Sequence, residues 1–135
     1  MDQFVIRPGP ELSGTVQVQG AKNSALKLMA ATLLAEGEYT IHNVPRIADV
    51  EIMRELLESM GVESAWVAPS TEGSLTIARG PDDACSPEAT YELVERMRAS
   101  IVVLGPLLGR FGRARVALPG GDDFGSRPID MHLAG

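Results

Sequence analysis

The chain has 135 residues, of which 44% are hydrophobic and 22% charged, and this length and composition are those of a single globular domain. A formal net charge of −6 and only six aromatic residues argue against a non-specific nucleic-acid binder, which relies on positive fields and stacking platforms. The sequence has no basic leader, no apolar run of the about 18 residues that a membrane span needs, and one cysteine, Cys85, so it predicts a cytoplasmic protein without a membrane span.

The first part of the chain predicts a strand, a helix and a second strand. Residues 15–18 alternate between polar and apolar side chains, as in a half-buried strand. Residues 26–35 are strong helix formers, and Asn23 or Ser24 suits the N-cap of that helix. The second strand is expected at residues 39–44.

A second helix is predicted to begin at Asp49, as its N-cap, and to end before Gly61. Its apolar residues follow the 3.6-residue spacing of a helix face that packs on a core. These residues are Val50, Met53, Leu56, Leu57 and Met60. Residues 63–68 and 74–78 then indicate two paired strands across a polar turn.

The second half of the chain repeats this order. Pro45 and Pro119 lie 74 residues apart, and the same offset places residues 33–34 on residues 107–108, both Leu-Leu pairs. A helix is followed by an alternating strand at 113–118. The offset predicts an α/β fold built from repeated βαβαββ units, of which about one and a half are present.

The last nine residues, 127–135, occupy the place where the first unit begins its second helix. The chain therefore stops within about two turns of a helix start. Half a unit leaves an apolar face without a partner. We expect a fragment of a longer protein.

Lys22 and Asn23 lie at the predicted start of the first helix. Free N–H groups and the positive end of the helix dipole attract anions there, and a lysine adds a full charge. A lysine at a helix N-terminus is electrostatically unfavourable when no anion is present. Two interpretations stay open: an anion site, or capping alone with a solvated lysine.

An arginine-rich segment carries a second group of cations. From Arg96 to Gly121 there is no Asp or Glu, and five arginines fall in this window. Arg96 and Arg98 lie 74 residues after Lys22 and Ser24, and a planar guanidinium suits phosphate or carboxylate. A small-anion site and ordinary surface charges are both compatible with this segment.

The loop at residues 118–128 carries the adjacent carboxylates Asp122 and Asp123, followed by Arg127. Its three glycines and two prolines give a loop of the kind that often bears catalytic groups. Repulsion between neighbouring carboxylates can raise the pKa of one of them and leave a proton for acid catalysis. A solvated Asp-Asp turn is the commoner alternative, and because no third ligand is close in sequence, no metal site is predicted.

Three motifs together carry a family resemblance: GAKNS at residues 20–24, ERMRASIVVLGPLLGRFG at 95–112, and ALPGG with FGSRPIDMH between 117 and 132. With them the chain resembles the N-terminal part of the UDP-N-acetylglucosamine 1-carboxyvinyltransferases, enolpyruvyl transferases that begin peptidoglycan precursor synthesis. The resemblance covers essentially the whole chain. It implies the enolpyruvyl transferase fold, here a partial inside-out α/β barrel.

The resemblance also implies a reaction and site residues. The family transfers the enolpyruvyl group of phosphoenolpyruvate to the 3-hydroxyl of UDP-N-acetylglucosamine and releases phosphate, through a tetrahedral intermediate and without a metal or organic cofactor. By the family pattern, Lys22 and Asn23 contact the phosphoenolpyruvate region, and Arg98 binds substrate. The implied nucleotide-sugar site is lined by Arg127, Pro128, Ile129, Asp130 and Met131.

The sequence departs from the family pattern in two ways. Where most members have a loop cysteine that donates a proton to the methylene carbon, this chain has Asp122, which can take the same role if burial or Asp123 raises its pKa. Members are also longer, and a second domain closes over the site and supplies the general base. The resemblance therefore implies that residues 1–21 pack with a missing C-terminal domain and that 22–135 form an incomplete N-terminal domain.

Two functions from different classes stay open. The chain is either the N-terminal portion of an enolpyruvyl transferase, inactive alone, or a stand-alone module that binds a nucleotide sugar or another anion without catalysis. A reading frame that continues after Gly135 favours the first function, and a stop codon there favours the second.

Overall fold

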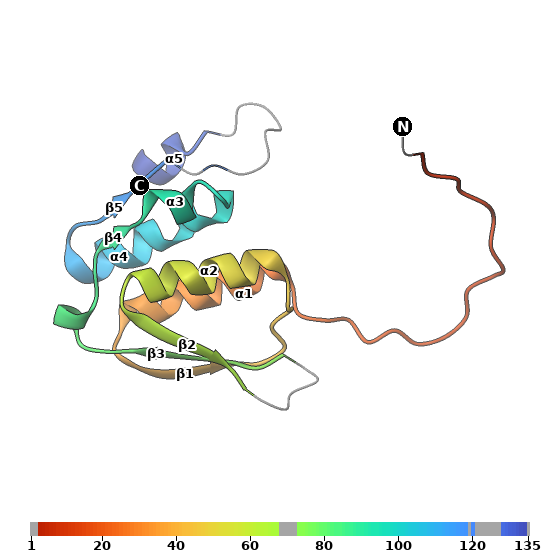
Figure 1. The fold of residues 1–135 in the computed structure, drawn as a ribbon, viewed down its shortest axis with the longest axis horizontal. Coiled ribbons are helices and arrows are strands. Elements are labelled where there is room, and N and C mark those ends of the chain that lie inside the picture. Colours follow the sequence, from red (N-terminus) through yellow and green to blue (C-terminus); the bar gives the residue numbers. More distant parts are fainter. Residues whose placement is uncertain (1–2, 68–72, 119, 121–127, 135) are drawn as a thin grey trace.

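The structure, a computed structural model, describes residues 3–67, 73–118, 120 and 128–134. Its first half alternates helices and strands, as the sequence predicts, and contains a three-stranded sheet (Figure 1). The elements are α1 (Lys22–Ala31), the short 3-10 helix η1 (Thr32–Leu34), β1 (Gly37–Ile41), α2 (Ala48–Ser59), β2 (Val62–Trp66) and β3 (Leu75–Arg79).

The second half forms a smaller α/β arrangement. Its elements are η2 (Asp82–Ala84), β4 (Glu88–Ala89), α3 (Tyr91–Val94), η3 (Arg98–Val103), α4 (Leu104–Phe111), β5 (Arg115–Val116) and α5 (Asp130–Ala134). Strands β4 and β5 pair in parallel, and the helical segment between them makes the crossover that parallel strands require. Helix α4 ends at Gly112, whose φ of 67° lies in the left-handed region that suits a helix C-terminus.

The three-stranded sheet has the order β1-β3-β2 and is antiparallel throughout. The predicted pairing of the strands now seen as β2 and β3 is confirmed. Helices α1 and α2 cover one face of this sheet, and α3, α4 and the β4-β5 pair lie beyond them (Figure 1). This arrangement makes α1 a central element, which packs against both α2 and η3.

The hydrophobic core lies between the sheet and the helices. The apolar face predicted for α2 is confirmed, since each of its five residues is 0% exposed; they are Val50, Met53, Leu56, Leu57 and Met60. Helix α1 contributes Ala25, Leu26, Met29 and Ala30 to the same core. The alternating pattern of β3 buries Leu75 and Ile77 beneath the helices.

The predicted helix caps were wrong. Helix α1 begins at Lys22 with Ala21 at the N-cap position, so Asn23 and Ser24 lie inside the first turn. Helix α2 likewise begins after Ile47, and neither helix has a side-chain cap hydrogen bond. Contacts between distant segments, described below, fix these starts in place of a local cap.

The strand predicted at residues 15–18 is also absent. Residues 3–19 run away from the body of the molecule as an extended tail (Figure 1), and Val16 and Val18 are 86% and 80% exposed. A strand needs a neighbouring edge for its backbone N–H and C=O groups, and the tail lies beside none in the described part of the chain. The first unit is therefore αβαββ, whereas β4 supplies an opening strand to the second.

Candidate functional site

Lys22 and Asn23 project from the first turn of α1, where their side chains are exposed. The Lys22 ammonium forms an ion pair with Asp49 in the first turn of α2, with 2.6 Å between Nζ and Oδ2. Asp49, which the sequence predicts as the N-cap of α2, lies in the first turn of that helix, and its contact with Lys22 has no signal in the local sequence. The anion that a lysine at a helix start requires is thus present as a carboxylate of the same chain.

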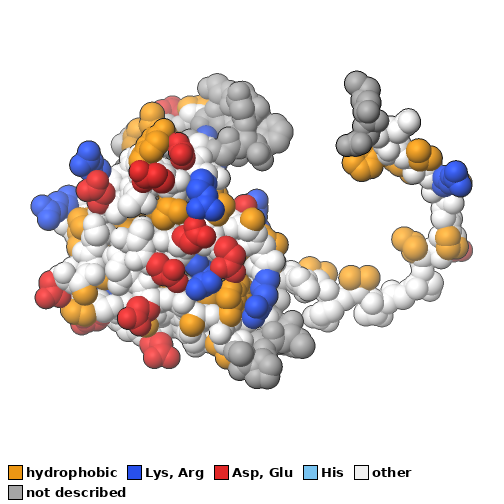
Figure 2. Space-filling view, in the orientation of Figure 1, with side chains coloured by type: hydrophobic (Ala, Val, Ile, Leu, Met, Phe, Trp, Pro, Cys, Tyr) orange, Lys and Arg blue, Asp and Glu red, His pale blue; other side chains and the backbone are white. Residues whose placement is uncertain are grey.

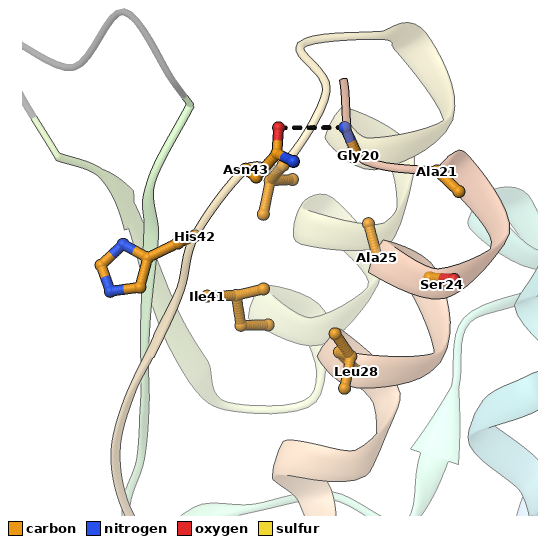
Figure 3. Close-up of a pocket in the computed structure, with 9 residues that line it drawn as sticks. Gly20, Ala21, Ser24, Ala25, Leu28, Ile41, His42 and Asn43 are labelled. Atoms are coloured by element: carbon orange, nitrogen blue, oxygen red, sulfur yellow. Dashed lines mark hydrogen bonds between the residues drawn. The ribbon is translucent and has the colours of Figure 1, made fainter. Parts of the chain in front are cut away.

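The backbone before Lys22 is fixed by the connection between β1 and α2. The N–H of Gly20 donates a hydrogen bond of 2.9 Å to Asn43 Oδ1 (Figure 3). Asn43 has a φ of 56°, a left-handed conformation that asparagine adopts more readily than most residues. A Cβ atom on Gly20 would lie 1.8 Å from the carbonyl oxygen of Asn43, so only glycine permits this close approach.

A pocket of about 140 Å³ lies beside this contact. Ala25 and Leu28 of α1 line one side of it, and Ile41 of β1 lines the other (Figure 3). The His42 ring points away from α1 (Figure 3), and its Nδ1 lies 3.0 Å from Ser74 Oγ. This hydrogen bond joins the end of β1 to the residue before β3, which is a structural role for His42.

Arg98 is the first residue of η3 and is partly buried. Because η3 packs against α1, the two elements that begin with predicted substrate-binding cations are in contact. Gly120, at the foot of the loop that bears Asp122, donates a hydrogen bond of 3.4 Å to the carbonyl of Val94. Gly120 therefore lies beside the segment that leads to Arg98.

The remaining predicted site residues belong to the end of the chain. Asp122 and Arg127 lie outside the described residues. Pro128 and Ile129 precede α5, in which Asp130 and Met131 occupy the first turn. Pro128, Asp130 and Met131 are exposed, and Ile129 is partly buried.

Three of the five arginines in the acid-free window form ion pairs with carboxylates from earlier in the chain. The partners are Glu55 for Arg96 at 2.7 Å, Asp82 for Arg110 at 3.0 Å and Glu88 for Arg115 at 3.4 Å. Figure 2 shows acidic and basic side chains next to one another on the viewed face. These three charges are accounted for without a bound ligand.

A charged cluster around the buried Arg79 lies at the end of β3, and its only mark in the sequence is one arginine in an apolar strand. The Arg79 side chain is 0% exposed and pairs with Asp82, which also binds Arg110. Hydrogen bonds from Arg79 and then Arg110 hold the pKa of the Asp82 carboxyl below its usual range. The Arg79 guanidinium lies 5.6 Å from the centroid of the Phe111 ring, so the cluster ties β3 to α4.

The described part of the chain contains no group of three or more His, Cys, Asp or Glu side chains arranged to hold a metal ion. None of its helices combines the length and the hydrophobicity of a membrane span.

The α/β fold is that of enolpyruvyl transferases. The crystal structure of the enolpyruvyl transferase NikO from Streptomyces tendae matches this chain with a TM-score of 0.63 and 27% sequence identity. The match covers 78% of this chain and 23% of the NikO chain. The chain belongs to the EPSP synthase (3-phosphoshikimate 1-carboxyvinyltransferase) family, whose model matches residues 6–135.

Similar proteins carry a more specific name. A UDP-N-acetylglucosamine 1-carboxyvinyltransferase from Anaeromyxobacter sp. (strain K) is 54% identical over 98% of this chain and 31% of its own length. Proteins of the same name from Chloroherpeton thalassium and Myxococcus xanthus are 54% and 49% identical, over 30% and 31% of their own lengths. The chain spans about a third of the length of these curated relatives.

Proposed function

We propose that this chain forms the N-terminal part of an enzyme that transfers the enolpyruvyl group of phosphoenolpyruvate to the 3-hydroxyl of UDP-N-acetylglucosamine, the first committed step of peptidoglycan precursor synthesis. The observation that carries the proposal is the 54% identity, over 98% of the chain, to a relative named for this activity. The cytoplasmic location expected from the sequence stays a prediction.

The proposed reaction joins two substrates and releases inorganic phosphate. The sugar oxygen bonds to C2 of phosphoenolpyruvate while C3 receives a proton, which gives a tetrahedral intermediate. The 3-hydroxyl proton passes to a general base that the missing domain supplies. Loss of a proton from C3 and cleavage of the C2–O bond to phosphate then restore the double bond.

Residues of this chain take defined roles in the proposed site. Lys22 binds the phosphate group, because its exposed ammonium lies at a helix start where anions are favoured. Asn23 lies next to it in the same turn of α1, and Arg98 binds substrate from η3. Asp122 donates the proton to the methylene carbon.

The proposed nucleotide-sugar contacts come from the segment that leads into α5. The residues are Arg127, Pro128, Ile129, Asp130 and Met131. Because a second domain is expected to close the site and supply the general base, the isolated chain should bind substrate weakly and release no phosphate above background.

A chimera tests the proposal. This chain replaces the matching part of the Anaeromyxobacter relative, and phosphate release from phosphoenolpyruvate is measured with and without UDP-N-acetylglucosamine. We expect release only when both substrates are present, and its loss in Lys22→Ala. A chimera that melts cooperatively but releases no phosphate would contradict the proposal. Binding of UDP-N-acetylglucosamine by the isolated chain without turnover in the chimera would favour the stand-alone binding module.

A further inference from the structure

The ion pair between Lys22 and Asp49 joins the starts of two helices. Each charge affects its own helix differently: a carboxylate in the first turn of α2 is favourable, whereas an ammonium in the first turn of α1 is unfavourable. The ion pair, with 2.6 Å between Nζ and Oδ2, therefore offsets the unfavourable charge of Lys22 on α1 with the favourable charge of Asp49 on α2. The side chains of Lys22 and Asp49 are 51% and 31% exposed, so a ligand can reach the pair from solvent.

The backbone keeps these two residues within reach of each other. Gly20 and Asn43 are in direct backbone contact two residues before Lys22 and six residues before Asp49. This contact fixes the start of α1 against the connection that leads into α2. The ammonium and the carboxylate thus meet because the fold places them together.

We infer that Asp49 lowers the affinity of Lys22 for anions, an inference that rests on the proposed function of Lys22 as a phosphate-binding residue. In the ligand-free chain the Asp49 carboxylate forms an ion pair with the Lys22 ammonium. An incoming anion has to replace that carboxylate or share the ammonium with it.

The competition lowers the affinity of every anion that Lys22 binds. A ligand that replaces the Asp49 carboxylate must first open the ion pair, and this cost is the same for a phosphate and for a carboxylate. A ligand that shares the ammonium is repelled by the Asp49 charge, and a dianion is repelled more than a monoanion. Asp49 therefore weakens phosphate binding at Lys22 at least as much as it weakens carboxylate binding.

A second ion pair on α2 provides a matched control. Glu55 and Arg96 pair at 2.7 Å, and both side chains are 49% exposed. Glu55→Gln and Asp49→Asn each remove one negative charge from the same helix and leave one cation without its partner. Only Asp49→Asn changes the surroundings of Lys22.

The test titrates the full 135-residue chain with inorganic phosphate and, separately, with acetate, at a slightly alkaline pH where phosphate is mostly a dianion. The NMR signals of the Lys22 ammonium and backbone amide report binding at the site. For Asp49→Asn we expect about two- to fivefold tighter phosphate binding, the range set by the strength of exposed ion pairs. Acetate binding should strengthen by the same factor or by a smaller one, because the ion pair competes with both anions and the Asp49 charge repels a monoanion less than a dianion.

The controls separate a specific role from a general change of charge or fold. Glu55→Gln should bind phosphate at Lys22 as the unsubstituted chain does, and Lys22→Met should remove the response to phosphate. Asp49→Glu, which keeps the charge at the start of α2, should restore the original affinity for phosphate. Circular dichroism checks that each variant retains its helix content.

The outcomes also distinguish this inference from the proposed function. If the unsubstituted chain binds phosphate at Lys22 while Asp49→Asn binds it equally or more weakly, the inference about Asp49 fails and the role of Lys22 stands. If neither chain shows a Lys22 response to phosphate, both fail. A larger gain in affinity for acetate than for phosphate in Asp49→Asn would overturn the inference, because neither competition nor repulsion by Asp49 produces it.

Discussion

Arg79 is fully buried, yet its Nε–H has no hydrogen-bond partner among the described residues. Its other two nitrogens donate to the Gly80 carbonyl, at 3.0 Å, and to Asp82. Burying a charge and a polar N–H group costs free energy that such an ion pair offsets only in part. The cluster therefore contributes to the positioning of β3 and α4 more than to net stability.

Removal of Asp82 and removal of Arg79 should therefore change the stability of the fold by different amounts. Asp82→Ala should lower the melting temperature clearly, because it leaves Arg79 buried without a counterion. Arg79→Met should leave the free energy of unfolding within about 1 kcal/mol of the original value, or raise it, because it removes the buried charge and leaves Asp82, whose side chain is 49% exposed, paired with Arg110. Chemical denaturation of both variants gives the comparison. Greater destabilisation by Arg79→Met would show that the ion pair itself stabilises the fold.

The lowered pKa of Asp82 predicts how stability depends on pH. Between the folded and the unfolded pKa of this carboxyl, the unfolded chain binds more protons than the folded one, so stability rises with pH in that window. The contribution of Asp82 should be complete above about pH 4 and disappear as the pH falls through the folded pKa. Unfolding free energies measured across the acid range should show a weaker pH dependence in Asp82→Asn.

Asp122 is the residue at which the proposed chemistry can be tested most directly. In the chimera, Asp122→Asn should lose most turnover, because an amide cannot donate the proton that the methylene carbon requires. Asp122→Cys should keep activity and become sensitive to fosfomycin, an epoxide that alkylates the family's loop cysteine as a thiolate. Normal turnover in Asp122→Asn together with loss in Asp123→Asn would assign the proton donor to Asp123.

At the scale of the elements, the start of α1 depends on a contact with a loop far away in sequence. Gly20→Ala would place its Cβ atom 1.8 Å from the Asn43 carbonyl oxygen, so the backbone must move. We expect a loss of about 1–3 kcal/mol in the free energy of unfolding, as for other overpacked sites. Gly105→Ala in α4 is the control, because a Cβ there meets no atom within 4 Å; equal effects of the two substitutions would contradict the explanation.

The elements that could be predicted are those with a strong local pattern. The apolar face of α2 and the pairing of β2 with β3 follow from side-chain periodicity, which is a property of a short segment. Periodicity alone could not decide whether residues 15–18 form a strand, because an alternating segment forms a strand only where the edge of another strand is available. The helix starts were misplaced for a similar reason: neither helix has a side-chain cap, and the Gly20–Asn43 hydrogen bond and the Lys22–Asp49 ion pair next to these starts join segments far apart in the sequence.

The candidate site could likewise be predicted only where its residues have a local signal. The position of Lys22 at a helix start follows from the break at Gly20 and the helix formers after it. Its partner could not be predicted, because Asp49 reaches Lys22 only through the path of the β1 to α2 connection. Arg79 gave a single signal, a charged residue in a strand that buries every second side chain.

At the scale of the whole molecule, the described chain leaves apolar side chains exposed at both of its ends. In the tail, Phe4, Ile6 and Leu12 are each more than 90% exposed, and Met131 and Leu133 of α5 are 83% and 64% exposed. Such residues favour association when no partner covers them. The isolated chain should therefore be marginally stable or self-associate.

Deletion of residues 1–19 separates marginal stability from self-association. The shortened chain should melt at the same temperature, because the tail packs against no described element, and it should associate less in analytical ultracentrifugation. The full chain should show concentration-dependent sedimentation. A sharp, concentration-independent melt of a monomeric full chain would count against the prediction.

The central position of β3 in the sheet has a consequence for the order of folding. Trp66 pairs with Leu75 across a short connection, whereas Ile41 reaches the same Leu75 from across α2. Closing the shorter loop costs less chain entropy, so the β2-β3 hairpin should form first and then provide the edge on which β1 assembles. During synthesis β1 leaves the ribosome before β3 does, and its backbone groups have no partner in this sheet until β3 has followed.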